Sequence, residues 1–84
     1  MKYRAEIDVM PHDNLLDPQG KAVEQGAKHL GFNNVLKTRI GKYIEFFVDT
    51  NDEEAANSEV KQYCEKLLVN PNIEDFDYKI EVVE

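Results

Sequence analysis

Two glycine–lysine pairs are the residues of this sequence whose types come nearest to a phosphate-binding loop: Gly20-Lys21 and Gly41-Lys42. A P-loop also needs a glycine five residues before the glycine of such a pair, because its backbone N–H groups cradle phosphate oxygens. Leu15 and Leu36 stand at that position, so neither pair is a P-loop. Gly20 could still bring a helix N-terminus close to a phosphate or a carboxylate, although close packing is the preferred interpretation.

The other candidates for chemistry are acidic residues, one cysteine and two histidines. Asp49–Glu53 resembles the start of a calcium loop, but Glu54 occupies the sixth position, where that loop requires glycine. We interpret these residues as helix caps, and the acidic cluster Glu74–Asp77 as a solvated turn. Cys64 lies among apolar helix positions, which indicates a buried small side chain instead of a nucleophile. No cysteine, histidine and carboxylate set has the spacing of a zinc site or a triad, so we expect neither catalytic nor metal-binding residues.

Composition limits the classes of partner. The chain has 84 residues and a formal net charge of −7, with charges of both signs mixed along it. This acidity disfavours nucleic acid, whose binding depends on cationic contacts with phosphates, and it disfavours anionic membrane surfaces. One cysteine excludes an internal disulfide, and no apolar run has transmembrane length, so we expect a cytoplasmic protein. We predict one domain over residues 1–84, with a thin core and leftover apolar surface that favours a partner.

The elements that must position these residues follow from hydrophobic periodicity. Residues 2–9 alternate apolar and charged side chains, which predicts a strand with one buried face. A helix is predicted over 18–30, with Asp17 as its N-cap, Pro18 in its first turn and Gly31 as its end. Its apolar side chains recur at helical spacing, at Val23, Ala27 and Leu30.

Three further strands are predicted from the same alternation. They cover residues 35–40, 42–50 and 76–82. A tight hairpin is expected to join the first two at Gly41, because glycine suits the positive φ that such a turn requires.

A second helix is predicted between the last two strands. It begins after an N-cap at Asn51 or Asp52 and ends before Asn70-Pro71. Its expected apolar stripe consists of Ala56, Val60, Tyr63, Cys64 and Leu67. The element order is therefore βαββαβ. This order predicts an α+β, ferredoxin-like fold, in which a four-stranded antiparallel sheet carries both helices on one face.

The predicted sheet face away from the helices carries charged side chains with a few apolar ones among them. Two interpretations stay open: a solvated face whose opposite charges pair between strands, or an oligomer interface. The residues of this face are Lys2, Arg4, Glu6, Val35, Lys37, Arg39, Tyr43, Glu45, Phe47, Asp77 and Lys79.

Three blocks of sequence carry a resemblance to a known family. Leu15–Val23 reads LLDPQGKAV, Arg39–Tyr43 reads RIGKY, and Cys64–Leu68 reads CEKLL. In this order and spacing they resemble the PurS family, the small subunit of phosphoribosylformylglycinamidine (FGAM) synthase, over residues 2–81. The polar stretch at 11–14 and the acidic, asparagine-rich stretch at 51–57 depart from the usual family pattern.

The resemblance implies a non-catalytic subunit of an ATP-dependent ligase complex in de novo purine (IMP) biosynthesis. That complex converts formylglycinamide ribonucleotide to its amidine with ammonia released from glutamine. The implied partners are a PurL-type synthetase subunit, a PurQ-type glutaminase subunit and a second copy of the chain, as a homodimer or a dimer of dimers. ATP, magnesium and glutamine are expected on the partner subunits, with no cofactor on this chain.

The resemblance also implies which residues bind partners. In the helix entrance they are Asp17, Gln19, Gly20 and Lys21, and at the predicted hairpin tip they are Arg39, Gly41 and Lys42. The hairpin residues are expected to form a protruding basic prong. The alternative, from fold analogy alone, is a stand-alone dimeric regulatory domain that binds a small metabolite.

Overall fold

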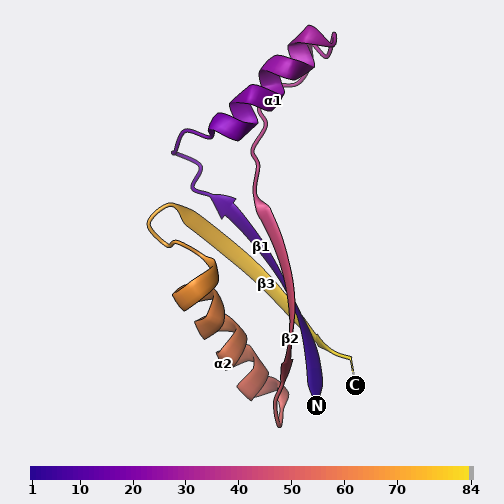
Figure 1. The fold of residues 1–84 in the computed structure, drawn as a ribbon, viewed down its shortest axis with the longest axis vertical. Helices are drawn as coiled ribbons and strands as arrows, with labels where there is room; N and C mark the ends of the chain where they lie inside the picture. Colours follow the sequence, from indigo (N-terminus) through magenta and orange to yellow (C-terminus); the bar gives the residue numbers. More distant parts are fainter. Residues whose placement is uncertain (84) are drawn as a thin grey trace.

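The sheet of this protein has three antiparallel strands in the order β2-β1-β3, with the predicted first strand in the centre (Figure 1). The computed structural model describes residues 1–83. The strand bounds are Lys2–Pro11 for β1, Lys42–Asp49 for β2 and Glu74–Val82 for β3. Ile7 pairs with Ile44 on one side and with Tyr78 on the other, which places apolar side chains of all three strands on one face.

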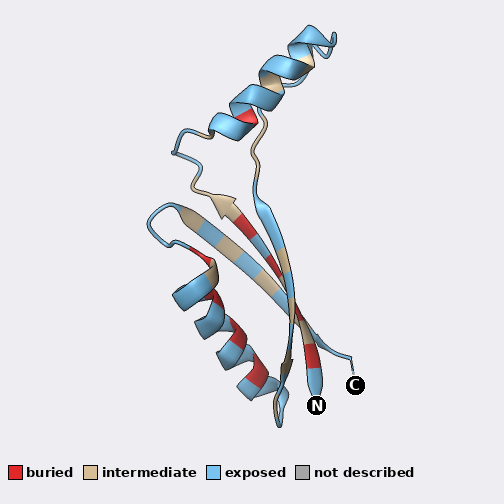
Figure 2. Cartoon of the chain, viewed as in Figure 1, coloured by how far each residue is buried: buried red, intermediate tan, exposed pale blue. Residues whose placement is uncertain are grey.

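One helix covers the apolar face of the sheet. Helix α2 (Glu53–Tyr63) begins at the predicted cap, where the Asp52 side chain accepts a hydrogen bond from the Ala55 N–H at 2.8 Å. The buried side of α2 and of the turn after it faces β1, and Figure 2 shows burial concentrated between these elements. The buried cluster consists of Ala5, Ile7, Val9, Val60, Cys64 and Val69. Such a small core matches the expectation for a short chain.

Helix α2 ends in a wider turn that alters its apolar stripe. Cys64–Leu68 forms a π-helical turn, η1, in which the Val69 N–H donates to the Cys64 carbonyl at 3.0 Å. A π-turn takes more residues per turn than an α-helix, so the side chains after Cys64 rotate relative to the predicted stripe. The prediction that Leu67 is buried is therefore wrong, since it is 73% exposed, whereas Val69 is buried.

Helix α1 (Pro18–His29) lies apart from the sheet, and this corrects the predicted arrangement of both helices on one face (Figure 1). Residues 12–40, here called the arm, extend beyond the end of β1 and return to β2. The molecule measures 52 × 27 × 14 Å, with a radius of gyration of 16.8 Å. A compact chain of this length has a radius of gyration of about 12 Å. The arm therefore protrudes from the sheet and α2.

The predicted strand over 35–40 does not form, so the sheet of the described residues has three strands instead of four. The predicted hairpin turn at Gly41 is also wrong. The backbone runs from 35 into β2 without a turn, and among the described residues only Gly31 has a positive φ, 91°. Gly31 thus ends the first helix as predicted.

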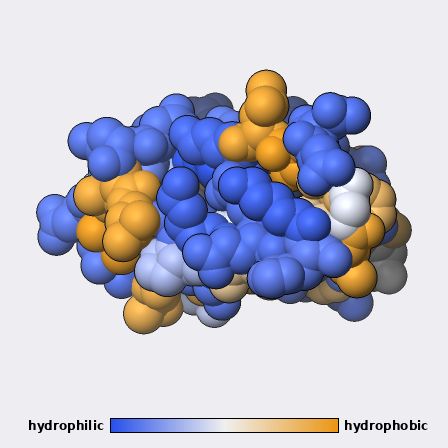
Figure 3. All heavy atoms as spheres, turned by 90° about the horizontal axis from the view of Figure 1, so that it is seen from above, coloured by the Kyte–Doolittle hydropathy of each residue, from blue (hydrophilic) through white to orange (hydrophobic). Residues whose placement is uncertain are grey.

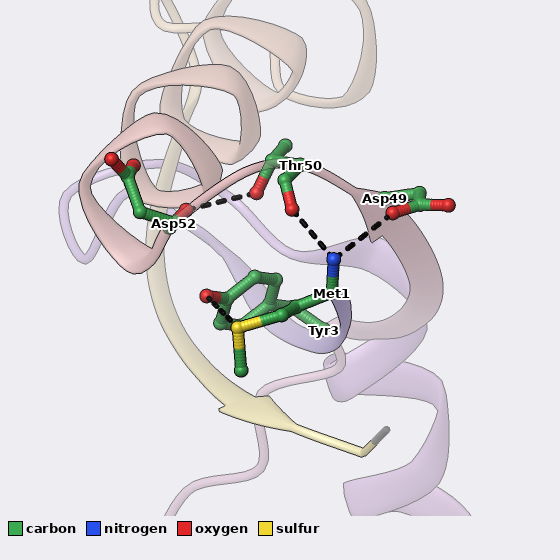
Figure 4. A network of polar contacts seen from close by, with 5 residues as sticks. All are labelled: Met1, Tyr3, Asp49, Thr50 and Asp52. Atoms are coloured by element: carbon green, nitrogen blue, oxygen red, sulfur yellow. Dashed lines mark hydrogen bonds and ion pairs between the residues drawn. The ribbon is translucent and has the colours of Figure 1, made fainter.

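A polar network closes the opposite end of the sheet (Figure 4). The Met1 amino group contacts Asp49 Oδ1 at 3.3 Å and donates to the Thr50 carbonyl at 2.8 Å. The Thr50 hydroxyl donates to the Asp52 carbonyl at 2.9 Å, and the Tyr3 hydroxyl contacts Met1 Sδ at 3.8 Å. These contacts join the start of β1 to the end of β2 and the N-cap of α2.

Candidate functional site

Asp17 connects the outgoing and the returning segments of the arm. One carboxylate oxygen accepts the Gly20 N–H at 3.0 Å, which caps helix α1 as predicted. The other accepts the Ile40 N–H at 2.8 Å, from the segment that returns toward β2. These hydrogen bonds, from Gly20 first and Ile40 second, lower the pKa of Asp17 below its ordinary value because they favour the charged carboxylate. One carboxylate thus starts the helix and fixes the returning segment beside it.

Two of the predicted glycines permit close approaches of the backbone. A Cβ atom at Gly20 would overlap the Thr38 carbonyl, so glycine lets α1 lie against the returning segment. A Cβ atom at Gly41 would overlap the Val9 carbonyl and the Met10 side chain. The close-packing interpretation of Gly20 is therefore confirmed, and Gly41 has the same role where the arm meets the sheet.

The hairpin tip predicted to carry a basic prong does not form, and its two cations lie in ion pairs. The Arg39 guanidinium donates to the Pro11 carbonyl and pairs with Asp13 Oδ1 at 2.9 Å. Lys42 Nζ lies 3.5 Å from Glu74 Oε2 at the start of β3. These contacts attach the returning segment of the arm to the end of β1 and join the start of β2 to the start of β3.

Two open clefts flank this junction. The larger, about 630 Å³, is mostly apolar and includes Asp17, Gln19 and Lys42 among its lining residues. The smaller, about 500 Å³, includes Asp17, Lys21 and Arg39. The structure therefore brings the predicted partner-binding residues together at one end of the sheet. Gln19 and Lys21 are exposed there, whereas Gly20 is buried. Within the described part of the chain, no group of three or more His, Cys, Asp or Glu side chains is arranged to hold a metal ion.

Sequence reasoning missed several residues of this junction. Glu74, interpreted as part of a solvated turn, pairs with Lys42 and accepts the Asn70 N–H at 2.9 Å. Ile40 and Thr38 contribute only backbone atoms, which no side-chain pattern reveals. The role of Glu74 could have been predicted from its position as the first residue of β3, directly after the turn.

The sheet face opposite α2 shows the predicted pairing of charges. Arg4 pairs with Glu81 of β3 and with Glu6, whose Oε1 lies 3.3 Å from Arg4 Nε. Partial burial, with the nearby carboxylates of Glu6 and Glu45, raises the pKa of Tyr43. Tyr43 and Phe47 are both 57% exposed on this face, so the solvated face and the oligomer interface both stay open.

Among the described residues, the three most exposed large apolar side chains lie on the arm. Leu16, Leu30 and Leu36 are 76%, 78% and 91% exposed, respectively. Val23 is exposed as well, so the predicted apolar stripe of α1 has nothing to cover in this chain. Seen from the α1 end, hydrophobic side chains form separate groups within a hydrophilic surface (Figure 3). The apolar side chains of the arm are therefore left uncovered within one chain. None of the described helices combines the length and the apolar character needed to cross a membrane.

The sequence matches known proteins over nearly its whole length. The model of the PurS family, described as phosphoribosylformylglycinamidine (FGAM) synthase, matches residues 4–82. The PurS subunit of this synthase from Bacillus subtilis is 40% identical over 81 residues, which cover 96% of this chain and 95% of the relative. The PurS subunit from Methanocaldococcus jannaschii is 34% identical over 82 residues, which cover 98% and 99%.

The fold also matches solved structures of PurS and of a complex that contains a PurS-like chain. The structure of Bacillus subtilis PurS superposes with a TM-score of 0.85 at 39% identity, covering 95% of this chain and 99% of that one. The structure of PurLQS from Thermotoga maritima contains a chain that matches with a TM-score of 0.88 at 33% identity, covering 96% and 99%. The arm, α2 and the sheet therefore have the arrangement seen in these relatives.

Proposed function

Because this chain belongs to the PurS family of FGAM synthase subunits, we propose that it joins the glutaminase subunit to the ATP-dependent synthetase subunit and supports ammonia transfer between them. The observation that carries this proposal is the match to a chain of the PurLQS structure over 96% of the present chain. In this role the chain performs no reaction itself. ATP, magnesium and glutamine bind to the partner subunits, and the complex works in the cytoplasm.

The chemistry of the junction supports a structural role. A catalytic group needs a free position beside a substrate and a pKa suited to proton transfer. Asp17 instead uses both carboxylate oxygens on backbone N–H groups, and its lowered pKa keeps it charged at neutral pH. Arg39 and Lys42 are paired with Asp13 and Glu74. The polar groups of the junction thus hold the arm in place.

The exposed residues of the junction are suited to contact a partner subunit. Gln19 and Lys21 lie on the first turn of α1, exposed to solvent beside the two clefts. Asp17, Gly20 and Gly41 set the shape of the arm that presents them. We assign the contact to Gln19 and Lys21 and the shaping to the other three.

The chain also self-associates in this proposal, as a homodimer or a dimer of dimers. The exposed apolar side chains of the arm, with Leu36 the most exposed, supply surface for a second copy. The ferredoxin-like sheet of four strands belongs to that assembled state.

Co-purification tests the proposal. A tagged copy of the chain should retain the purified glutaminase and synthetase subunits together. Lys21→Glu should weaken that retention, whereas Lys28→Glu, a matched reversal in the last turn of the same helix, should not. Circular dichroism of both variants confirms that the helix persists.

Failure of the unchanged chain to retain either subunit would contradict the proposal. The alternative regulatory domain predicts a different result. It requires that a nucleotide or amino acid raise the melting temperature of the isolated chain in the absence of both partners.

A further inference from the structure

The sheet face opposite α2 presents its side chains in rows that cross the three strands. The first of three such rows holds one cation and one anion, the second two anions and one cation, and the third two anions and no cation. Negative charge therefore increases toward the end of β1 from which the arm extends. The rows are Phe47, Arg4 and Glu81; Glu45, Glu6 and Lys79; and Tyr43, Asp8 and Asp77.

Two pairs of carboxylates stand directly opposite each other on this face. Glu6 lies opposite Glu45, and Arg4 compensates that pair in part, with its Nε 3.3 Å from Glu6. Asp8 lies opposite Asp77, and both are exposed. Neither of these two side chains has an ion-pair partner within residues 1–83. Like charges opposite one another on neighbouring strands destabilise a sheet, so folding alone does not explain the Asp8–Asp77 pair.

An exposed aromatic ring lies among these carboxylates. Tyr43 is 57% exposed and stands next to Asp8 in the third row. Arginine stacks on aromatic rings and pairs with carboxylates, and both arginine and tyrosine are enriched in protein interfaces. The set of Glu6, Asp8, Tyr43, Glu45 and Asp77, here called the acidic face, is therefore suited to cationic side chains.

The charge of the acidic face limits what can bind there. A second copy of the chain carries the same face and the same net charge of −7, so contact through it would bring like charges together. Nucleic acids are anionic and are disfavoured for the same reason. A basic protein surface has the complementary charge.

A subunit that joins two other subunits needs two separate contact surfaces. The contact assigned to Gln19 and Lys21 lies on α1 and carries a cation. The acidic face lies on the sheet, apart from α1, and has the opposite charge (Figure 1). Surfaces of opposite charge distinguish two partners, because each surface repels the partner of the other.

We propose that the acidic face binds an arginine- or lysine-bearing surface of the partner subunit that does not contact Gln19 and Lys21. This inference rests on the proposed assembly role and adds the chemistry of its second contact. In the complex, cations of the partner pair with Asp8 and Asp77, and a guanidinium stacks on Tyr43. The two opposed carboxylates, which destabilise the free chain, become favourable when the partner binds.

The double variant Asp8→Asn/Asp77→Asn tests this contact, because it removes both charges with little change in side-chain shape. The melting temperature of the isolated chain should rise by about 1–5 °C, since the repulsion between the strands is gone. The dissociation constant for one partner subunit should rise about tenfold at low salt. Higher stability together with weaker binding is a result that a purely structural role does not give.

The variant Glu54→Gln/Glu59→Gln is the matched control. It removes the same number of charges from exposed positions of α2, which covers the other face of the sheet. Its dissociation constants for both subunits should stay within about twofold of the original values. Surface plasmon resonance with each purified subunit measures these constants. Salt should weaken binding of the unchanged chain more than binding of Asp8→Asn/Asp77→Asn, because it screens the removed charges.

Substitution of Tyr43 provides a second test that leaves the charges in place. Tyr43→Ala should weaken binding of the same subunit, whereas Tyr43→Phe, which keeps the ring, should retain it. Equal binding by these two variants would contradict the stacking of a guanidinium on Tyr43.

The outcomes separate this contact from the assembly role. If the unchanged chain and Asp8→Asn/Asp77→Asn bind both subunits equally well, the acidic face is not a contact, although the assembly role stands. If that variant loses self-association in the ultracentrifuge and still binds both subunits, the face belongs to a second copy and the inference is overturned. Weakened binding of the same subunit by this variant and by Lys21→Glu would contradict two separate surfaces. Failure of the unchanged chain to bind either subunit would overturn the assembly role itself.

Discussion

Two alanine substitutions in helix α1 should have opposite effects on the arm. Gly20 and Gly26 lie in the same helix, but their surroundings differ. A Cβ atom at Gly20 would overlap the Thr38 carbonyl, whereas a Cβ atom at Gly26 would meet nothing within 4 Å. Gly20→Ala should therefore separate α1 from the returning segment, and Gly26→Ala should stabilise the helix.

The magnitude follows from two opposing contributions. Replacing glycine by alanine in a helix stabilises it by about 1 kcal/mol. Forcing a methyl group against closely packed backbone costs about 1–3 kcal/mol. Both variants gain the helix stabilisation, but only Gly20→Ala also carries the cost of the overlap with the Thr38 carbonyl. The two variants should then differ by about 1–3 kcal/mol, which is about a five- to 150-fold difference in an opening equilibrium.

Amide hydrogen exchange measures this difference directly. Peptides covering Pro18–His29 should exchange faster than the unchanged chain in Gly20→Ala and more slowly in Gly26→Ala. Peptides from β1 should change little in either variant, because β1 lies in a separate core. Equal exchange of α1 in the two variants would refute the close packing of Gly20 against Thr38.

Three further perturbations test the packing and the charges. Acidification should loosen the arm through Asp17: its folded pKa lies below the ordinary 3.8, so its contribution is complete above that pH and is lost as the pH falls through the folded pKa. An Asp17 carboxyl that titrates at or above 3.8 by NMR would contradict this. Val60→Ala should lower the free energy of unfolding by about 2 kcal/mol in urea, whereas exposed Glu59→Ala should change it by less than about 0.5 kcal/mol. Burial raises the pKa of the Cys64 thiol, so a thiol reagent should modify it only under unfolding conditions, and rapid modification of the folded chain would contradict the buried position.

The sequence correctly predicted the elements that depend on residues close together in the chain. The alternation of residues 2–9 predicted the central strand, because one face of β1 is buried. Asp17 was identified as an N-cap and Asp52 as one of two candidates for the other, and each accepts a backbone hydrogen bond. Gly31 ends α1 with a positive φ. In each case the cause lies within a few residues of the effect.

The errors concern partners that the sequence of one chain does not specify. Alternation over 35–40 predicts an extended segment, but it does not specify whether a neighbouring strand is present to pair with it. The stripe of α1 predicts an apolar face but not the surface that covers it. In the candidate site, Asp17 was identified as a cap, while its second hydrogen bond, to Ile40, depends on a backbone 23 residues away. The prediction of a protruding prong was wrong for the same reason. Arg39 binds the Pro11 carbonyl at the end of β1, a contact that depends on a residue far away in the sequence.

Glutamine-dependent FGAM formation, measured with purified synthetase and glutaminase subunits in the presence and absence of this chain, tests the assembly role most directly. The proposed function predicts that glutamine supports synthesis only when the chain is added, whereas free ammonia supports it in both cases. An equal glutamine-dependent rate without the chain, or turnover by the chain alone, would contradict the proposal.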